Sequence, residues 1–288
     1  MKIGFIGTGI MGSRMAHNLI KNNYELIVQN RTKEKADSLI KEGAGWADSP
    51  LDVAAKVGTI FTMLSNPDAV YEAALGESGF LSGMKHNAIW VDCSTVNPSF
   101  SKDMGKKANG YGVRFMDAPV AGTKQPALNG ELTFFVGGNK KDFDEVKPLF
   151  EKMGKKIIYA GECGKGTSMK MIVNLMLGAA MASFSEALVL GESLGFDKET
   201  ILNTLLGGPV TAPYLTAKKE KFLKNEYETE FPLQWMHKDL QLISDTAGET
   251  KVTLPTTGAV RDIFALANQQ GFGEFDFSSL YKFLSKKN

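Results

Sequence analysis

Short apolar runs alternate with amphipathic segments through the first half of the chain. The runs hold β-branched and aromatic side chains between turn residues, which is typical of buried strands. They predict strands at Ile3–Ile6, Glu25–Gln29, Thr59–Leu64, Ala88–Asp92, Val113–Ala118, Leu132–Val136 and Lys156–Tyr159. Helical spacing between the runs predicts helices at Met11–Lys21, Lys33–Glu42, Leu51–Lys56, Asp68–Leu75, Pro98–Asn109 and Lys141–Lys152. This alternation indicates β-α-β units and a mainly parallel sheet with helices on both faces.

After Gly161 the strand pattern ends, and helical spacing continues along the rest of the chain. A long apolar helix is expected from about Ser168 to Leu194. The predicted fold class is α/β: a Rossmann-type doubly wound sheet in residues 1–163, followed by an all-α C-terminal domain in residues 164–288, with 164–195 as a connecting helix. Further helices are predicted at Lys198–Leu206, Tyr214–Leu223, Leu233–Gly248, Thr257–Gln270 and Ser278–Lys286.

The stretch Met169–Leu194 is the most apolar of the chain and has the length of a membrane span. Polar and charged side chains interrupt it, so we expect a buried helix of a soluble protein and no membrane partner. Its methionines offer more apolar surface than a small domain covers, which favours a homodimer or a homotetramer. The interrupting residues are Lys170, Asn174, Ser183, Ser185 and Glu186.

Composition narrows the class of protein. A formal net charge of +1 gives no global field that would favour nucleic acid as a partner. The chain has 2 cysteines, Cys93 and Cys163, and neither they nor the 3 histidines have the spacing of metal ligands, so no metal is expected. The N-terminus does not have the pattern of a secretory signal, and the expected location is the cytoplasm.

A glycine-rich turn follows the first predicted strand. The segment from Gly7 to Gly12 matches the spacing G-x-G-x-x-G and leads into a predicted helix. In this motif the first glycine makes the tight turn, the second lets the backbone approach a pyrophosphate, and the third allows close packing of helix and strand. We therefore expect a dinucleotide on the backbone of Gly7, Thr8, Gly9, Ile10, Met11 and Gly12.

The end of the second predicted strand indicates which nicotinamide cofactor binds. An acidic residue there would accept hydrogen bonds from the ribose of NAD, but this chain has Asn30, Arg31 and Thr32. The Arg31 guanidinium can pair with a 2′-phosphate, and Asn30 and Thr32 can donate hydrogen bonds to it. The predicted cofactor is NADP(H), although an arginine at a helix start or facing solvent would give the same pattern.

Three segments carry candidate polar side chains: Val91–Val96, Asp117–Thr123 and Gly164–Asn174. The strands of the first two would end at the carboxyl edge of the sheet, where open α/β folds bind ligands. In the third, Lys170 and Asn174 are four residues apart and share one helical face. A lysine in so apolar a segment is either functional or extends its amine to solvent, and helical spacing alone leaves both readings open.

Taken together, these segments match the motifs of a known protein family. The chain resembles the β-hydroxyacid dehydrogenase family, which includes 3-hydroxyisobutyrate dehydrogenases and glyoxylate/succinic semialdehyde reductases, over essentially its whole length. The resemblance rests on five ordered motifs: the glycine turn, Asp92-x-Ser94-Thr95, Ala118-Pro119-Val120-x-Gly122, Gly164-x-Gly166-x-x-x-Lys170-x-x-x-Asn174, and His237-Lys238-Asp239-Leu240.

The resemblance implies a role for particular residues. Lys170 is then the catalytic lysine, and Asn174 supports it. Thr95 and Lys238 approach the nicotinamide half of the cofactor, and Met63 and Leu64 are also assigned to cofactor binding. The substrate carboxylate is held by Gly122 and Thr123, together with Ser94 or Thr95, and the substrate pocket also includes Phe231 and Asp239.

The segments Gly122–Ala127 and Thr211–Pro213 look more like the glyoxylate/succinic semialdehyde reductases than the hydroxyisobutyrate enzymes. The resemblance thus implies an NADPH-dependent reductase of a small carboxylated aldehyde, with Lys170 as proton donor to the developing alkoxide. Ala121 stands where the family usually has serine, which leaves the substrate open. Two alternatives remain: an NAD-dependent 3-hydroxyisobutyrate dehydrogenase, and a non-catalytic NADP-binding protein.

Overall fold

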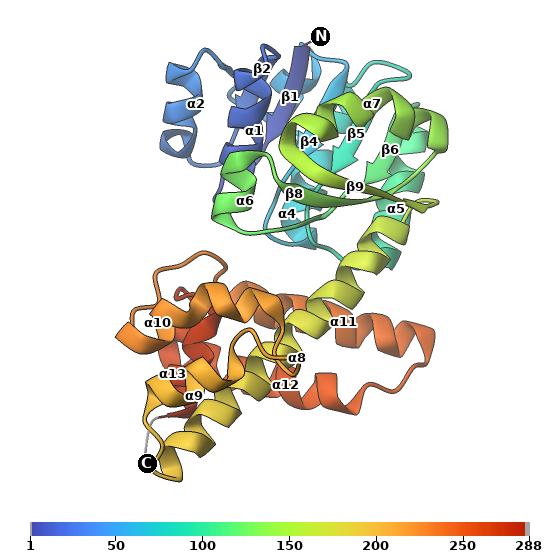
Figure 1. Cartoon of the computed structure of the whole chain (residues 1–288). Coiled ribbons are helices and arrows are strands. Elements are labelled where there is room, and N and C mark those ends of the chain that lie inside the picture. Colours follow the sequence, from blue (N-terminus) through green and yellow to red (C-terminus); the bar gives the residue numbers. More distant parts are fainter. Residues whose placement is uncertain (1, 286–288) are drawn as a thin grey trace. The chain divides into compact units, whose positions relative to one another are not determined.

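The computed structural model describes residues 2–285 and divides the chain into two compact units, Met1–Lys170 and Met171–Asn288 (Figure 1). The first unit is α/β and the second is helical, so the predicted fold class is confirmed. Lys286, which we expected to end the last helix, lies outside the described residues.

The first unit is built on a nine-stranded sheet. Its first six strands are all parallel and lie in the order β3-β2-β1-β4-β5-β6, which is the doubly wound arrangement of dinucleotide-binding folds. Strand β8 pairs antiparallel with β6 and β7 and parallel with β9. The strands are β1 (Lys2–Ile6), β2 (Glu25–Gln29), β3 (Gly45–Trp46), β4 (Thr59–Thr62), β5 (Ile89–Asp92), β6 (Arg114–Asp117), β7 (Val120–Ala121), β8 (Leu132–Gly137) and β9 (Gly154–Gly161).

Successive apolar side chains along each strand point to opposite faces of the sheet, and they form a separate core on each face. In β1, Phe5 belongs to one core and Ile6 to the other, as expected for a period of two. Trp90 of β5 lies in the second core against Phe80 and Phe115, with ring centroids 5.0 and 4.7 Å away. The covering helices are α1 (Gly12–Lys21), α2 (Asp37–Lys41), α3 (Pro50–Ala54), α4 (Pro67–Leu75), α5 (Pro98–Gly110), α6 (Lys124–Asn129) and α7 (Lys140–Met153), with 3₁₀ turns at Lys33–Ala36 and Phe80–Gly83.

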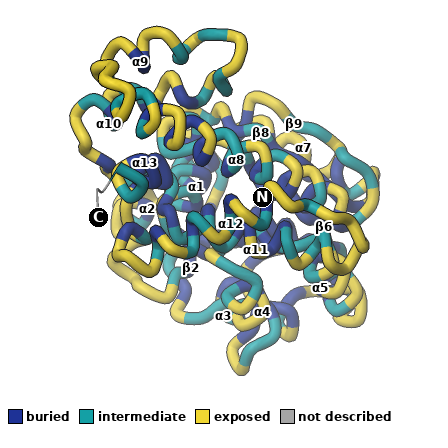
Figure 2. Tube along the Cα trace, turned by 90° about the horizontal axis from the view of Figure 1, so that it is seen from below, coloured by how far each residue is buried: buried dark blue, intermediate teal, exposed yellow. Residues whose placement is uncertain are grey.

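The second unit is a helical bundle with one core, and buried and exposed stretches alternate along its helices (Figure 2). Two glycines let helices of this unit approach closely. A Cβ at Gly178 would lie 3.1 Å from Leu240, and one at Gly191 would lie 2.6 Å from Ile201. The helices are α8 (Lys165–Ser193), which begins in the first unit, α9 (Lys198–Leu205), α10 (Lys219–Lys224), α11 (Leu233–Thr250), α12 (Pro255–Ala267) and α13 (Leu280–Leu284), with short turns at Pro213–Lys218, Asn268–Phe272 and Phe277–Ser279.

Helix α8 is long and apolar enough to cross a membrane when judged by length and composition alone. Met181 and Leu188 on one face of this helix are fully buried in the core of the second unit. Ile172, Met176 and Leu190 are each more than half exposed. The helix is therefore buried on one face and exposed on another, whereas we expected a buried helix.

Three short elements were not expected from the sequence. Strands β3 and β7 have two residues each, so they are too short to show a period. Helix α6 contains Pro126 and buries only Ala127, so it has no apolar stripe that would reveal it. In addition, the expected helices Lys33–Glu42 and Tyr214–Leu223 each divide into a 3₁₀ turn and a short α-helix.

Candidate active site

The glycine turn between β1 and α1 is constrained at two positions by nearby backbone carbonyl groups. Gly7 has φ +95°, and a Cβ there would overlap with the Met63 carbonyl oxygen. A Cβ at Gly12 would overlap with the Gly7 carbonyl oxygen. Gly9 differs, because a Cβ there would have no atom of the described residues within 4 Å. The fold requires Gly7 and Gly12, while Gly9 keeps a space open beside the turn.

The turn fits the pyrophosphate of a dinucleotide. Helix α1 begins without a side-chain cap and without an acidic residue in its first turn, so its N–H groups and partial positive charge face the turn. The Thr8 hydroxyl is buried and has no hydrogen-bond partner among the described residues. A buried polar atom of this kind is normally satisfied by a ligand or water. With the open space at Gly9, these features match an anionic ligand held by backbone N–H groups.

The loop after β2 is tied to the glycine turn. Asn30 Oδ1 accepts a hydrogen bond of 3.0 Å from the Thr8 backbone N–H, and Asn30 Nδ2 donates one of 2.9 Å to the Thr32 carbonyl oxygen. Arg31 is exposed and has no hydrogen bond or ion pair within residues 2–285. Asn30 therefore acts within the protein to join the two loops, and the Arg31 guanidinium remains available to a ligand.

A buried network joins the ends of β4 and β5. Asp92 Oδ1 accepts hydrogen bonds from the Thr62 hydroxyl at 2.7 Å and from the Ser94 backbone N–H at 3.1 Å. The Ser94 hydroxyl in turn accepts from the Leu64 backbone N–H at 2.9 Å. Burial raises the pKa of the Asp92 carboxyl, and these hydrogen bonds oppose the rise. Asp92 thus orders the loops that carry Met63, Leu64, Ser94 and Thr95, a role that we did not predict from the sequence.

A second buried aspartate holds the start of α8. Asp117, the last residue of β6, accepts hydrogen bonds of 2.7 Å from the Gly164 and Thr167 backbone N–H groups and one of 3.0 Å from the Thr167 hydroxyl. Burial raises the pKa of Asp117, and the hydrogen bonds from Gly164 and Thr167 oppose the rise. A Cβ at Gly166 would overlap with the Phe135 carbonyl oxygen, so only glycine allows this contact between helix and sheet.

The first turns of α8 are consequently fixed against β6 and β8. Lys170 lies in the second turn of the helix, and the residue is 8% exposed. Gly164 and Gly166 of the recognised motif therefore serve to place this lysine. Gly122 has φ +129° in the turn after β7, and Thr123 precedes α6 without capping it. These residues, with Ser94, are the part of the predicted site that belongs to the first unit.

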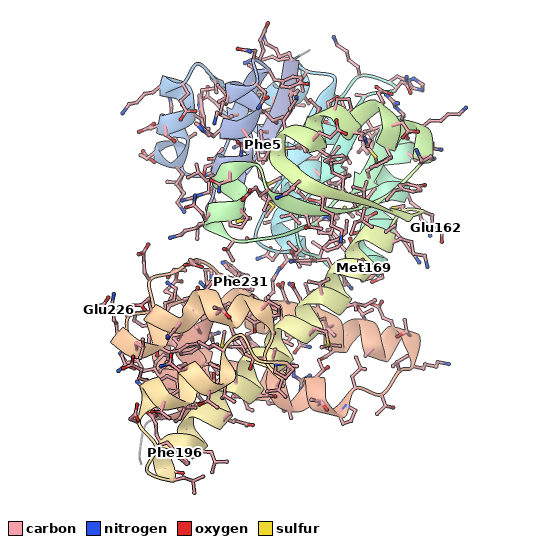
Figure 3. The ribbon with its side chains drawn as sticks, in the orientation of Figure 1. Phe5, Glu162, Met169, Phe196, Glu226 and Phe231 are labelled. Carbon is pink, nitrogen blue, oxygen red and sulfur yellow. The ribbon has the colours of Figure 1, made fainter. Side chains whose placement is uncertain are left out.

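The second unit brings together three other predicted residues. Asn174 Nδ2 donates a hydrogen bond of 2.6 Å to Asp239 Oδ2, and Lys238 Nζ lies 3.0 Å from Asp239 Oδ1 in an ion pair. Phe231, labelled in Figure 3 in the segment before α11, stacks edge-on against Phe277 with ring centroids 5.6 Å apart. The structure thus links Asn174, Lys238 and Asp239 directly and places Phe231 elsewhere in the same unit.

An open depression of about 740 Å³ lies elsewhere in the first unit, between α5 and the start of α7. Lys102, Lys106, Arg114 and Asp142 line it, and none of the predicted site residues does. Arg114 is already paired there with Asp142 and Glu145. Of the polar residues that the sequence singled out, Thr8, Arg31 and Ser94 follow the carboxyl ends of the parallel strands β1, β2 and β5, where open α/β folds bind ligands.

Loss of the Asp117 carboxylate should destabilise the protein. Asp117→Ala leaves the buried Gly164 and Thr167 backbone N–H groups at the start of α8 without their acceptor, and we expect the free energy of unfolding to fall by about 2–4 kcal/mol. Urea unfolding measures this. Asp197 is a matched control, because it also accepts from a threonine N–H and hydroxyl, at Thr200, but is exposed. Asp197→Ala should cost less, and an equal loss in both variants would contradict the role given to Asp117.

Comparison with known proteins shows the family of the chain. The family model described as the NAD binding domain of 6-phosphogluconate dehydrogenase matches residues 2–161, and that described as NAD-binding of NADP-dependent 3-hydroxyisobutyrate dehydrogenase matches residues 164–284. Glyoxylate/succinic semialdehyde reductase 1 of Arabidopsis thaliana is 36% identical over 280 residues, which cover 97% of this chain and 97% of that protein. The chain belongs to the β-hydroxyacid dehydrogenase family. The resemblance predicted from the five motifs is confirmed.

Solved structures of similar fold align with nearly the whole of this chain. A 3-hydroxyisobutyrate dehydrogenase from Salmonella typhimurium has a TM-score of 0.90 at 22% identity, covering 98% of this chain and 99% of that one, which shows the fold alone. Psf3 in complex with NADP+ and 2-OPP has a TM-score of 0.89 at 25% identity, with coverage of 98% and 100%. As a member of this dehydrogenase family, the protein is an oxidoreductase that acts on a hydroxyl group with a nicotinamide cofactor.

Proposed function

We propose that the protein is an NADPH-dependent reductase of small carboxylated aldehydes, converting succinic semialdehyde to 4-hydroxybutyrate and glyoxylate to glycolate. The observation that carries this proposal is the buried Lys170, which the Asp117 cap and Gly166 fix at the start of α8. The 36% identity to a glyoxylate/succinic semialdehyde reductase supports the substrate class.

Different residues of the chain have different roles in the proposed reaction. Bound NADPH supplies the hydride that the aldehyde carbon accepts. The Lys170 ammonium stabilises the negative charge that develops on the carbonyl oxygen and donates a proton to it, so that the aldehyde becomes an alcohol. Ser94, Gly122 and Thr123 hold the substrate carboxylate and thereby orient the reacting carbon. The glycine turn holds the pyrophosphate, and Arg31 holds the 2′-phosphate.

An assay of NADPH and NADH consumption with a panel of aldehydes tests the proposal. We expect succinic semialdehyde and glyoxylate to be reduced with NADPH, and uncharged aldehydes of the same size to be poor substrates. Oxidation of 3-hydroxyisobutyrate with NAD+ as the preferred reaction would favour the hydroxyisobutyrate dehydrogenase alternative. Binding of NADPH without turnover of any aldehyde or hydroxy acid would favour a non-catalytic protein.

Arg31 should determine the preference for NADPH. Replacing it with alanine removes a charged hydrogen bond to the 2′-phosphate, which contributes about 1.5–3 kcal/mol. We expect NADPH to bind about 10- to 100-fold more weakly and NADH almost unchanged, as measured by fluorescence titration. Lys35→Ala, at an exposed lysine of the 3₁₀ turn that follows this loop, is the control. Equal losses for both cofactors in Arg31→Ala would refute the assignment.

We also propose that the protein is a homodimer or homotetramer in which α8 lies at an interface with a second copy. Ile172, Met176 and Leu190 are each more than half exposed, and their spacing puts them on one face of α8. A second copy of the chain would cover this apolar stripe. Sedimentation should show an oligomer that Met176→Glu dissociates, whereas Val252→Glu, at an isolated exposed valine, should not. A stable, active wild-type monomer would contradict this.

A further inference from the structure

The side-chain amide of Asn174 is oriented by its partner. Its Nδ2 lies 2.6 Å from Asp239 Oδ2, and the two residues are 1% and 2% exposed. A carboxylate accepts hydrogen bonds and does not donate them, so the amide nitrogen must face Asp239. The Asn174 oxygen therefore points away from Asp239.

The Asn174 oxygen is an acceptor without a donor. Oδ1 is buried and has no hydrogen-bond partner among the described residues. Burying a polar atom without a partner is costly, so a site that keeps one has a use for it. Asn174 follows Lys170 by one turn of α8, and residues four apart share a helical face. The amide thus presents a carbonyl oxygen on the helical face that carries the proton donor of the proposed reaction.

Asp239 is held by two neighbouring side chains. Its Oδ2 accepts the hydrogen bond from Asn174, and its Oδ1 lies 3.0 Å from the Lys238 ammonium in an ion pair, with no hydrogen bond among the described residues. Almost none of the residue is exposed. A carboxylate would also repel the carboxylate of the proposed substrate. These observations support a structural role for Asp239, in addition to the place in the substrate pocket that the family resemblance implied.

The contact depends on close approach of α8 and α11. Gly178 lies one turn beyond Asn174 on the same face, and a Cβ there would be 3.1 Å from Leu240 and 3.3 Å from Met236 of α11. The lack of a side chain at Gly178 lets the two helices come near enough for the short Asn174–Asp239 hydrogen bond.

We propose that Asp239 is a positioning residue, which holds the Asn174 amide with its oxygen toward the face of Lys170 so that this oxygen accepts a hydrogen bond from the ammonium during proton transfer. The inference rests on the proposed function. The ammonium has three N–H donors, so one held by Asn174 leaves another directed at the carbonyl oxygen of the substrate. Asp239 then affects turnover and leaves substrate binding largely unchanged.

Exchanging the side chains of Asn174 and Asp239 tests this role. Asp239→Asn removes the group that dictates the amide orientation, and kcat should fall about 10- to 100-fold while KM changes less than about threefold. Asn174→Asp places two carboxylates together and should be worse. The double variant Asn174→Asp/Asp239→Asn restores a donor facing an acceptor and should recover at least about tenfold in kcat over Asn174→Asp. Asp245→Asn is the matched control, because Asp245 is an exposed aspartate of α11 that accepts from the Gln241 amide at 2.8 Å.

Thermal unfolding and NADPH titration of each variant separate loss of fold or cofactor from loss of turnover. A rise in KM as the main effect of Asp239→Asn, or no recovery in the double variant, would overturn the proposal. A readout independent of activity is the side-chain amide resonance of Asn174 in NMR, identified by its loss in Asn174→Asp. It should be slow to exchange in the wild type and fast in Asp239→Asn. If the wild type reduces no aldehyde, the proposed function fails, and this resonance still decides whether Asp239 orients the amide.

Discussion

Lys170→Ala should fold, bind NADPH normally, and lose at least about 100-fold in kcat for aldehyde reduction, which is the scale of general acid catalysis. The lysine is buried at the start of α8 and is the proton donor in the proposed reaction. Lys170→Arg should not restore activity, because a guanidinium gives up its proton poorly and differs in reach. Steady-state rates with succinic semialdehyde and glyoxylate measure the loss.

Lys165→Ala is the control for this variant, since Lys165 is an exposed lysine in the first turn of the same helix. Its kcat should equal that of the wild type. Unfolding must be measured in parallel, because removing a buried lysine also changes packing. A folded, NADPH-binding Lys170→Ala variant that reduces aldehyde at nearly the wild-type rate would disprove the assignment of the proton donor.

Two glycines of the turn after β1 should respond to alanine in opposite ways. Gly9→Ala should leave the free energy of unfolding within about 0.5 kcal/mol of the wild type, because its methyl group enters open space. It should weaken NADPH binding by at least about tenfold, since the backbone there approaches the pyrophosphate. Gly12→Ala should lower the free energy of unfolding by about 1–3 kcal/mol, because its methyl group would overlap with the Gly7 carbonyl oxygen.

Chemical denaturation and isothermal titration of the two variants give both quantities. Weak binding with normal stability in Gly9→Ala shows that the space beside the turn is occupied by the cofactor. If Gly9→Ala binds NADPH as tightly as the wild type, the pyrophosphate does not lie at this position.

The fold was predictable because its signals are local and repeated. Apolar runs such as Glu25–Gln29 coincide with a strand of the structure, and the first predicted helix starts within a residue of α1. Elements of two residues, such as β3 and β7, were missed because their conformation is set by pairing with a neighbouring strand. The hydrophobic periodicity of a single sequence does not show which strand such a short segment pairs with.

The site was less accessible from sequence than the fold. The motifs identified Lys170 and Asn174 as candidate site residues. The spacing of residues along the chain does not show which donors bind to a buried carboxylate. Asp117 accepts hydrogen bonds from Gly164 and Thr167, which are 47 and 50 positions away along the chain. Asp92 accepts a hydrogen bond from Thr62 of the neighbouring strand. The same applies to Asn30, whose amide joins two loops of the first unit. These contacts exist only once the chain has folded.

The glycine turn also bears on how such a sequence can change over evolutionary time. Gly7 and Gly12 are needed by the chain itself, because a side chain at either position would overlap with a carbonyl oxygen. Gly9 meets no such restriction from the described residues. A descendant that no longer used a dinucleotide would still lose stability on replacing Gly7 or Gly12, while position 9 could change to another small residue. A side chain at that position in a relative of this fold would therefore be a mark of lost selection for the cofactor.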